Sequence, residues 1–258
     1  MIRGLLFTGV YYVLSFVYVM ASLPMLAMPG RGPVTFVIRS YTRAIRWALR
    51  IICGIRTEVR GRDHLPAGAF ILAAKHQSWG DGFLIYPEVK QLAFVTGDHL
   101  EKFPLVGGIL RKLGAIVIDT CGGGDSKAKS LSEGMALAKA EGRRVLIYPE
   151  GHLAPPGHHF RYKPGVWHMQ RAMNVPVVPV ATNLGCFWQQ EALSKRPGKA
   201  VIQFLELIEP GMDKQAFLAR LEDQIESASS ALLAEARSSE ILRSELLPDP
   251  VKLVQKPG

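Results

Sequence analysis

Cysteine is scarce in this sequence, which has only Cys53, Cys121 and Cys186 among its 258 residues. Because their number is odd and their spacing is wide, a framework of paired disulfides is not expected. Four histidines gather between residues 152 and 168, but their spacing matches no metal-binding motif. The sequence therefore favours a protein of a reducing compartment, and it predicts no bound metal.

Two motifs of common enzyme classes are also missing. No Gly-x-Ser-x-Gly elbow surrounds Ser78, which argues against a serine hydrolase. The loop Cys121-Gly122-Gly123-Gly124 could approach a phosphate closely, but no Gly-Lys-Ser or Gly-Lys-Thr follows it. The sequence therefore excludes a nucleotide-binding P-loop at this position.

Acidic residues are in deficit, since 22 Asp and Glu stand against 31 Lys and Arg, which gives a formal net charge of +9. A positive charge of this size suits an anionic partner. Membrane lipid, nucleic acid and a phosphorylated substrate all fit, and the charge alone does not choose among them.

Charged residues are entirely absent from Leu5 to Met28. A helix over this stretch would rise about 36 Å, against a hydrocarbon core of about 30 Å. A cleaved signal peptide is the competing interpretation, but the stretch is long for one and only Arg3 precedes it. We expect a retained anchor, and the arginines that follow place the rest of the chain in the cytoplasm.

The segment from Pro33 to Ile55 has arginines at helical spacing, which form one stripe. They are Arg39, Arg43, Arg46 and Arg50. The opposite face is apolar, so the pattern predicts an amphipathic helix that lies at an anionic membrane surface. The alternative is a solvated basic face over a protein core.

The rest of the chain alternates between short apolar runs and longer amphipathic segments, which is typical of one α/β domain. We expect strands at 69–74, 91–96, 115–118, 144–148, 177–181 and 200–205, and helices at 101–113, 126–140, 164–173 and 213–237. The predicted organisation is a membrane anchor and basic helix over 1–56, a catalytic domain over 57–240 and a flexible tail over 241–258.

His76 follows the first of these strands, and Asp81 lies five residues further on. An imidazole can take a proton near neutral pH if a carboxylate holds its other nitrogen. On a regular helix the two side chains would point about 140° apart, so they meet only if the segment turns. Ser78 and Gly80 permit such a turn.

A second strand ends in Tyr148-Pro149-Glu150-Gly151, which places a carboxylate and a permissive glycine at another strand end. Two strand ends of this kind can face one cleft. The third block is Val175-Pro176-Val177-Val178-Pro179-Val180.

Together the three blocks resemble the glycerolipid acyltransferases, the lysophosphatidic acid acyltransferase family. Its marks are His-x4-Asp, a Phe-Pro-Glu-Gly-type block and a Val-Pro-x-Val-Pro block, in this order. The resemblance runs from about residue 55 to about residue 210. It implies an α/β fold with a mixed sheet flanked by helices, here with an N-terminal membrane-associated helix pair.

The resemblance also implies roles for individual residues. His76 would be the general base and Asp81 would hold its tautomer, while Glu150 and Gly151 would shape the acceptor-headgroup site. The family has a phosphate-binding arginine where this chain has Thr120, and it commonly has Thr-Arg where this chain has His152-Leu153. The cations that could replace them are Lys127, Lys129, Arg143, Arg144, Arg161 and Lys163. Arg161 and Lys163 are the nearest candidates, because they follow Glu150-Gly151.

The implied activity is transfer of a fatty acyl group from acyl-CoA or acyl-carrier protein to the free hydroxyl of a lysophospholipid, with 1-acylglycerol-3-phosphate as the first candidate. Membrane lipid and the acyl donor would be the partners, and no cofactor, metal or nucleic acid is expected. Two alternatives stay open: a different acceptor such as a lyso-aminolipid, and a non-catalytic membrane-binding scaffold.

Overall fold

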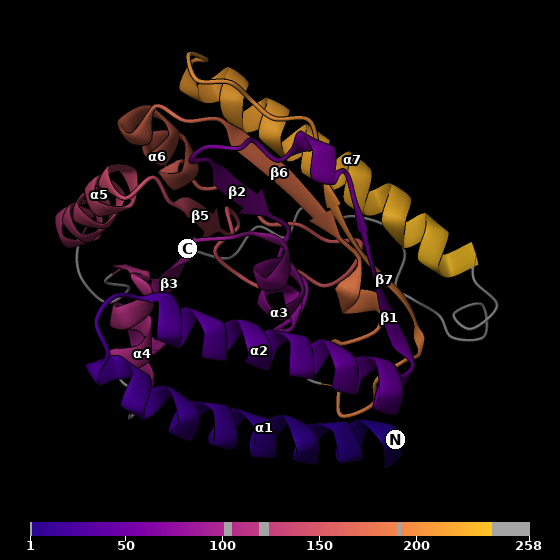
Figure 1. Ribbon diagram of the computed structural model, residues 1–258. Coiled ribbons are helices and arrows are strands. Elements are labelled where there is room, and N and C mark those ends of the chain that lie inside the picture. Colours follow the sequence, from indigo (N-terminus) through magenta and orange to yellow (C-terminus); the bar gives the residue numbers. More distant parts are fainter. Residues whose placement is uncertain (1, 101–104, 119–123, 190–191, 239–258) are drawn as a thin grey trace.

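A seven-stranded sheet forms the centre of the molecule (Figure 1), and the computed structural model describes residues 2–100, 105–118, 124–189 and 192–238. The strands are β1 Ile55–Arg60, β2 Ile71–Ala74, β3 Leu92–Gly97, β4 Ile116–Ile118, β5 Arg144–Ile147, β6 Val177–Thr182 and β7 Gly198–Phe204. Their order in the sheet is β1-β7-β6-β2-β5-β3-β4. All neighbours are parallel except β6 and β7, so the sheet is mixed, as predicted.

Helices cover both faces of the sheet (Figure 1). On one side lie α1 Ile2–Ala27, α2 Gly32–Ala48 with its π-helical extension η1 Leu49–Cys53, α3 Asp81–Ile85 and α4 Val106–Leu113. On the other lie α5 Gly124–Ala140, α6 Gly165–Met173 and α7 Lys214–Ser238. Four short 3₁₀ turns are η2 Arg62–His64, η3 Tyr86–Glu88, η4 Asp98–Leu100 and η5 Leu184–Cys186.

Alternation along β2 divides the interior into two cores. Ile71 and Ala73 pack with residues of α5, α6 and α7, whereas Leu72 and Ala74 pack with residues of α1, α2 and α3. Successive side chains of a strand point to opposite faces, so a four-residue strand serves both cores. All four side chains are buried, which explains why this run reads as continuously apolar.

The helix pair α1 and α2 packs on the sheet and shares its hydrophobic core. Phe7 of α1 and Ile45 of α2 are buried in the same cluster as Leu146 of β5. The expected division at residue 56 therefore does not separate two hydrophobic cores. The outer face of α1 is apolar and exposed, with Tyr12 66% and Phe16 66% accessible.

By length and composition, α1 could cross a membrane. An 18-residue window within Ile2–Ala27 has a mean hydropathy of 1.7, and 11% of that window is buried inside the protein. The exposed apolar face of α1 distinguishes it from the buried helices of a globular core.

The arginine stripe of α2 divides between protein and solvent. Arg39 donates to the backbone oxygens of Pro87 and Val89, at 3.2 and 3.0 Å, and Arg46 pairs with Glu88 at 2.5 Å. Arg43 and Arg50 are exposed. Half of the predicted cationic stripe thus binds the segment at η3, and the buried face of α2 rests on protein.

Most expected elements match the observed ones within a few residues, but β1 is a difference. The sequence predicts that the helix runs through Ile55, whereas a left-handed Gly54, with φ 71°, ends it and a strand begins. Residues 101–104 and the predicted tail at 241–258 lie outside the described residues.

Candidate active site

The ends of β2 and β5 lie side by side, which brings the first two sequence blocks together. The strands are parallel neighbours, with Ile71 opposite Val145 and Ala73 opposite Ile147. Parallel strands end at the same edge of a sheet, where sites form in α/β proteins. A hydrogen bond of 2.8 Å from the Ala154 N–H to the His76 carbonyl oxygen ties the chain after β5 to the end of β2.

His76 and Asp81 meet as the sequence predicts. The His76 Nδ1 lies 3.0 Å from Asp81 Oδ2, and the same oxygen accepts the N–H groups of Gln77 at 2.8 Å and Ser78 at 2.9 Å. These bonds wrap the turn around one carboxylate, which is why residues five apart can face each other. Among the described residues, Asp81 Oδ1 has no hydrogen-bond partner.

Gly80 makes the turn possible for a steric reason. A Cβ at this position would lie 2.6 Å from the Trp188 ring and 2.8 Å from Leu184, both of which are buried. The Gly80 N–H also donates to Ser78 Oγ at 3.1 Å, so the Ser78 hydroxyl is used in the turn. Any larger residue would push the turn away from Trp188 and displace Asp81, the next residue.

The imidazole of His76 is open to a substrate on one side. Its side chain is 21% exposed, whereas that of Asp81 is fully buried. Because the Nδ1–H donates to Asp81, the Nε2 atom carries the lone pair that can accept a proton. A buried carboxylate in this position would stabilise an imidazolium formed there.

The ring of Tyr148 stacks on the imidazole, with centroids 3.8 Å apart and an angle of 14° between the planes. Burial raises the pKa of the Tyr148 hydroxyl well above its usual value of 10.0, and the nearby Asp81 carboxylate raises it further. Tyr148 therefore stays neutral. Together with the hydrogen bond to Asp81, the stack fixes the plane of the imidazole.

The Glu150 carboxylate points into the protein. Its side chain is fully buried, with Oε1 3.2 Å from the Lys75 Nζ and Oε2 accepting the Phe160 N–H at 2.8 Å. Burial raises the pKa of Glu150 above 4.5, and the Lys75 ammonium offsets part of that rise. Glu150 can thus shape a headgroup site by holding the backbone near Phe160.

Gly151, Lys163 and His152 lie together just beyond β5. Gly151 adopts a left-handed φ of 68°, and a Cβ on it would come within 2.4 Å of the Lys163 Nζ. The Lys163 N–H donates to the Pro149 carbonyl oxygen at 2.9 Å, and the exposed His152 packs edge-on against Phe160 at 5.6 Å. Arg161 is exposed on the same segment. The structure therefore gathers two cations beyond the end of β5, and Thr120 lies outside the described residues.

The two cysteines of the described residues do not offer a reactive thiolate. Burial raises the pKa of Cys53 to about 11 and that of Cys186 to about 12, so neither thiol ionises near neutral pH. Within the same described residues, no group of three His, Cys, Asp or Glu side chains could hold a metal ion.

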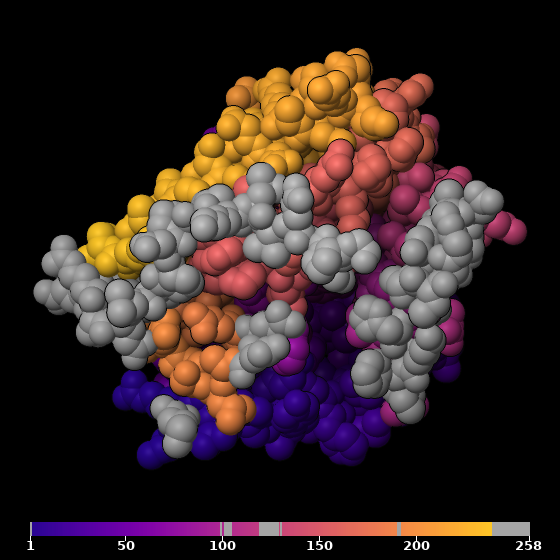
Figure 2. Space-filling view, turned by 180° about the vertical axis from the view of Figure 1, so that it is seen from behind, coloured from indigo at the N-terminus to yellow at the C-terminus, as the bar shows by residue number. Residues whose placement is uncertain are grey.

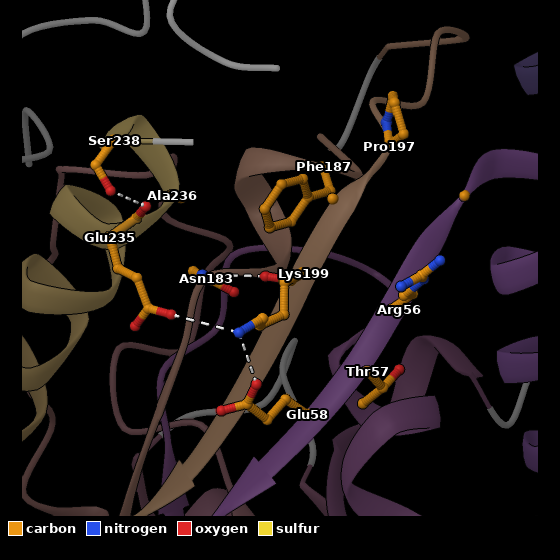
Figure 3. Close-up of a pocket in the computed structure, with 12 residues that line it drawn as sticks. Arg56, Thr57, Glu58, Asn183, Phe187, Pro197, Lys199, Glu235, Ala236 and Ser238 are labelled. Atoms are coloured by element: carbon orange, nitrogen blue, oxygen red, sulfur yellow. Dashed lines mark hydrogen bonds and ion pairs between the residues drawn. The ribbon is translucent and has the colours of Figure 1, made fainter. Parts of the chain in front are cut away.

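A hollow of about 730 Å³ lies away from this chemistry, along β1, β7 and the end of α7 (Figure 3). Glu58, Lys199 and Glu235 line it, and the Lys199 ammonium lies 3.0 Å from the Glu58 carboxylate. None of the residues that line it belongs to the His76 turn or to the 148–163 segment. This hollow is therefore separate from the candidate active site.

Sequence reasoning gave no role to two residues beside the site, Lys75 and Glu226. The Lys75 Nζ contacts both oxygens of Glu226, at 2.8 and 3.0 Å. Alternation along β2 could have shown that Lys75 points away from His76. No signal identifies Glu226, because its partner is 151 residues away in the sequence.

Comparison with known proteins supports one family. A sequence model of the Acyltransferase family matches residues 56–183. The chain is 29% identical over 212 residues to 1-acyl-sn-glycerol-3-phosphate acyltransferase from Pseudomonas aeruginosa, covering 81% of this chain and 80% of that protein. It is 32% identical over 110 residues to the lyso-ornithine lipid O-acyltransferase of the same organism, covering 42% and 41%.

The crystal structure of 1-acyl-sn-glycerophosphate acyltransferase from Thermotoga maritima has the same fold, with a TM-score of 0.75 and 23% identity over 93% of this chain and 99% of that one. The fold, the matched family model and the His76–Asp81 pair agree. The chain belongs to the glycerolipid acyltransferase family.

Proposed function

We propose that this protein transfers a fatty acyl group from the thioester of acyl-CoA or acyl-carrier protein to the free hydroxyl of a lysophospholipid, with 1-acylglycerol-3-phosphate as the acceptor. The observation that carries this proposal is the hydrogen bond of 3.0 Å between His76 Nδ1 and the buried Asp81. It leaves Nε2 as a base in an exposed position. A non-catalytic scaffold has no need of such a pair.

The reaction needs no covalent enzyme intermediate. The acceptor hydroxyl gives its proton to His76 Nε2 while its oxygen attacks the thioester carbonyl carbon. Asp81 stabilises the resulting imidazolium. The tetrahedral intermediate then collapses, the carbon–sulfur bond breaks, and the leaving thiolate takes the proton from Nε2, which returns the imidazole to its neutral form.

The acceptor headgroup would bind beside Gly151. Lys163 lies against this glycine and Arg161 is two residues away on the same exposed segment. A phosphate oxygen accepts charge-assisted hydrogen bonds from an ammonium or a guanidinium, and these are about twice as strong as neutral ones. These two cations would replace the family arginines that this chain lacks at Thr120 and in the His152-Leu153 pair.

A lyso-aminolipid is the second candidate acceptor. One relative is named a lyso-ornithine lipid O-acyltransferase, and its identity with this chain, 32%, is similar to that of the 1-acyl-sn-glycerol-3-phosphate acyltransferase. A headgroup without a phosphomonoester would not require an arginine at position 120. If Thr120→Arg blocks the natural acceptor while admitting lysophosphatidic acid, the headgroup is not a simple phosphate.

Membrane association of the catalytic domain on the cytoplasmic face is part of the proposal. The exposed apolar face of α1 supports it, as do Phe36 at 71% and Trp47 at 65% accessibility on α2. Exposed aromatic side chains next to the cations Arg43 and Arg50 suit the interface of an anionic bilayer.

One experiment tests the activity directly. The purified protein in detergent or vesicles is incubated with labelled acyl-CoA or acyl-carrier protein and a panel of lysolipids, including lysophosphatidic acid and lyso-ornithine lipid. Mass spectrometry identifies the product. We expect an acylated lysolipid with wild-type protein and none with His76→Ala, and transfer to no lysolipid contradicts the proposal.

A further inference from the structure

Lys75 precedes His76 directly, yet its side chain points to the opposite face of the sheet. Ile71 and Ala73 of β2 belong to the core under α6 and α7, and the alternation continues to Lys75. The Lys75 side chain is 1% exposed. A lysine is almost never fully buried unless it is paired, so its partners are informative.

The ammonium of Lys75 has a full set of partners inside the protein. It donates to both oxygens of Glu226 on α7, at 2.8 and 3.0 Å, and to the His158 carbonyl oxygen at 2.9 Å. The Glu150 Oε1 is 3.2 Å away. Because one ammonium faces two carboxylates, removing it would leave the buried Glu150 and the partly buried Glu226 without their shared cation.

The same charged groups hold the segment from His158 to Tyr162. Lys75 binds the His158 carbonyl oxygen, Glu150 accepts the Phe160 N–H at 2.8 Å, and Glu226 accepts the Tyr162 hydroxyl at 2.8 Å. Every second residue of the segment is therefore bonded to this buried ion cluster. Arg161 and Lys163 alternate with these residues and are exposed.

We propose that Lys75 is a positioning residue for acyl transfer. Its ammonium binds Glu226 and Glu150, and these two carboxylates hold the segment 158–163. Because Lys75 directly precedes His76 in the chain, it sets where this segment lies relative to the proposed base. This inference rests on the proposed function, because the segment carries the cations assigned to the acceptor headgroup. Arg161 and Lys163 touch the acceptor, whereas Lys75 acts only through the segment that it holds.

The kinetic test compares two lysine variants. Lys75→Met keeps the length of the side chain and removes its charge, and Lys199→Met does the same at an exposed ion pair with Glu58. We expect Lys75→Met to raise the acceptor KM and to lower kcat by about tenfold or more. A misplacement of reacting groups by about 1 Å can lower the rate about 10²-fold. The donor KM should stay unchanged, and Lys199→Met should behave as wild type.

A measurement that does not depend on activity separates this inference from the proposed function. Hydrogen exchange with mass spectrometry reports on the amides of 158–163, among them the Phe160 N–H that bonds to Glu150. We expect faster exchange there in Lys75→Met than in Lys199→Met. If the wild-type protein acylates no lysolipid, the proposed function fails, and this comparison still decides whether Lys75 holds the segment 158–163 in place.

The kinetic and exchange measurements together distinguish a positioning role of Lys75 from a purely structural one. Lower thermal stability with unchanged exchange at 158–163, or with unchanged kcat and acceptor KM, overturns the proposal because Lys75 then has a purely structural role. If Lys75→Met does not fold, Glu226→Gln carries the same two measurements, since it leaves the Lys75 ammonium beside Glu150. The double variant Lys75→Met/Glu226→Gln removes one of the two carboxylates that lose their cation. If its acceptor KM and its exchange rate at 158–163 are closer to wild type than those of Lys75→Met, the proposal is also supported.

Discussion

The Tyr148 ring lies parallel to the His76 imidazole, at a centroid distance of 3.8 Å, and covers one of its faces. The Phe-Pro-Glu-Gly-type block of the family has phenylalanine where this chain has Tyr148. A phenylalanine ring can make the same stack, so the stack needs the aromatic ring and not the hydroxyl. Burial and the nearby Asp81 carboxylate raise the pKa of the Tyr148 hydroxyl well above 10.0, so the hydroxyl stays protonated near neutral pH.

Tyr148→Phe should therefore keep kcat close to the wild-type value. Tyr148→Ala should lower kcat by about 2-fold to 12-fold, because an aromatic pair contributes about 0.5 to 1.5 kcal/mol beyond its buried area. Steady-state kinetics of both variants tests this. A large loss in Tyr148→Phe would mean that the hydroxyl has a chemical role.

Replacing His76 should abolish most turnover without unfolding the protein. His76→Ala should lower kcat by about 10²-fold to 10⁴-fold, the usual contribution of a general base, and Asp81→Asn should have nearly the same effect. Circular dichroism confirms the fold, and exposed His168→Ala is the control. Near-normal activity of folded His76→Ala would contradict the mechanism.

The cations beyond the end of β5 should control acceptor binding. Arg161→Ala or Lys163→Ala should raise the KM for lysophosphatidic acid about tenfold to 100-fold, because a lost charge-assisted hydrogen bond costs about 1.5 to 3 kcal/mol. The donor KM should change little. Arg171→Ala, which removes an exposed cation packed over Trp167 on α6, is the matched control. If both substitutions leave the acceptor KM unchanged, the headgroup binds elsewhere.

Glu150 should make stability depend on pH. Burial raises its folded-state pKa above 4.5, so the folded chain holds the proton more tightly than the unfolded chain. The free energy of unfolding then falls as the pH rises from about 4.5 through the raised value. Glu150→Gln has no carboxylate to titrate at this position, so its free energy of unfolding should not show this fall. The melting temperature of Glu150→Gln should therefore rise relative to that of the wild type as the pH increases over this range.

Thermal unfolding at several pH values measures that difference. Glu209→Gln, at an exposed glutamate, is the control and should show a difference that does not change with pH. A difference for Glu150→Gln that stays constant or shrinks as the pH rises would show that the Lys75 ammonium compensates the buried carboxylate fully.

Membrane affinity should depend on the exposed half of the arginine stripe. Arg43→Glu/Arg50→Glu should weaken binding to anionic vesicles by roughly thirtyfold or more, since each cation near such a surface contributes about 1 kcal/mol. Arg220→Glu on α7 is the control, because α7 and the helix pair lie on opposite sides of the molecule (Figure 2). Co-sedimentation at two salt concentrations measures the effect, and equal binding by all three proteins would contradict it.

The parts of the fold that rest on local patterns could be predicted from the sequence. The run 69–74 is apolar on both faces because β2 is covered by helices on both sides, and His76 and Asp81 meet through a turn that Ser78 and Gly80 allow. Strand ends could be assigned to one cleft because β2 and β5 are parallel neighbours.

Features that depend on distant partners could not be predicted. β1 carries Arg56, Glu58 and Arg60 and becomes a strand only by pairing with β7, about 140 residues later. Arg39 and Arg46 read as a membrane stripe because nothing in their own helix shows that Pro87, Val89 and Glu88 would bind them.

The shared core of the helix pair has a consequence for synthesis. Synthesis begins at the N-terminus, so α1 and α2 are made first. Ile45 and Leu49 belong to the same core cluster as Val180 and Ile202, which are added later. At about 5 to 20 residues per second, the roughly 150 residues in between take about 8 to 30 seconds. During that interval the residues of β2 and α3 in the same cluster are already present, but those of β6 and β7 are not. The core shared by the helix pair and the sheet is therefore completed only when β6 and β7 have been made, which ties the final packing of the first two helices to the end of the sheet.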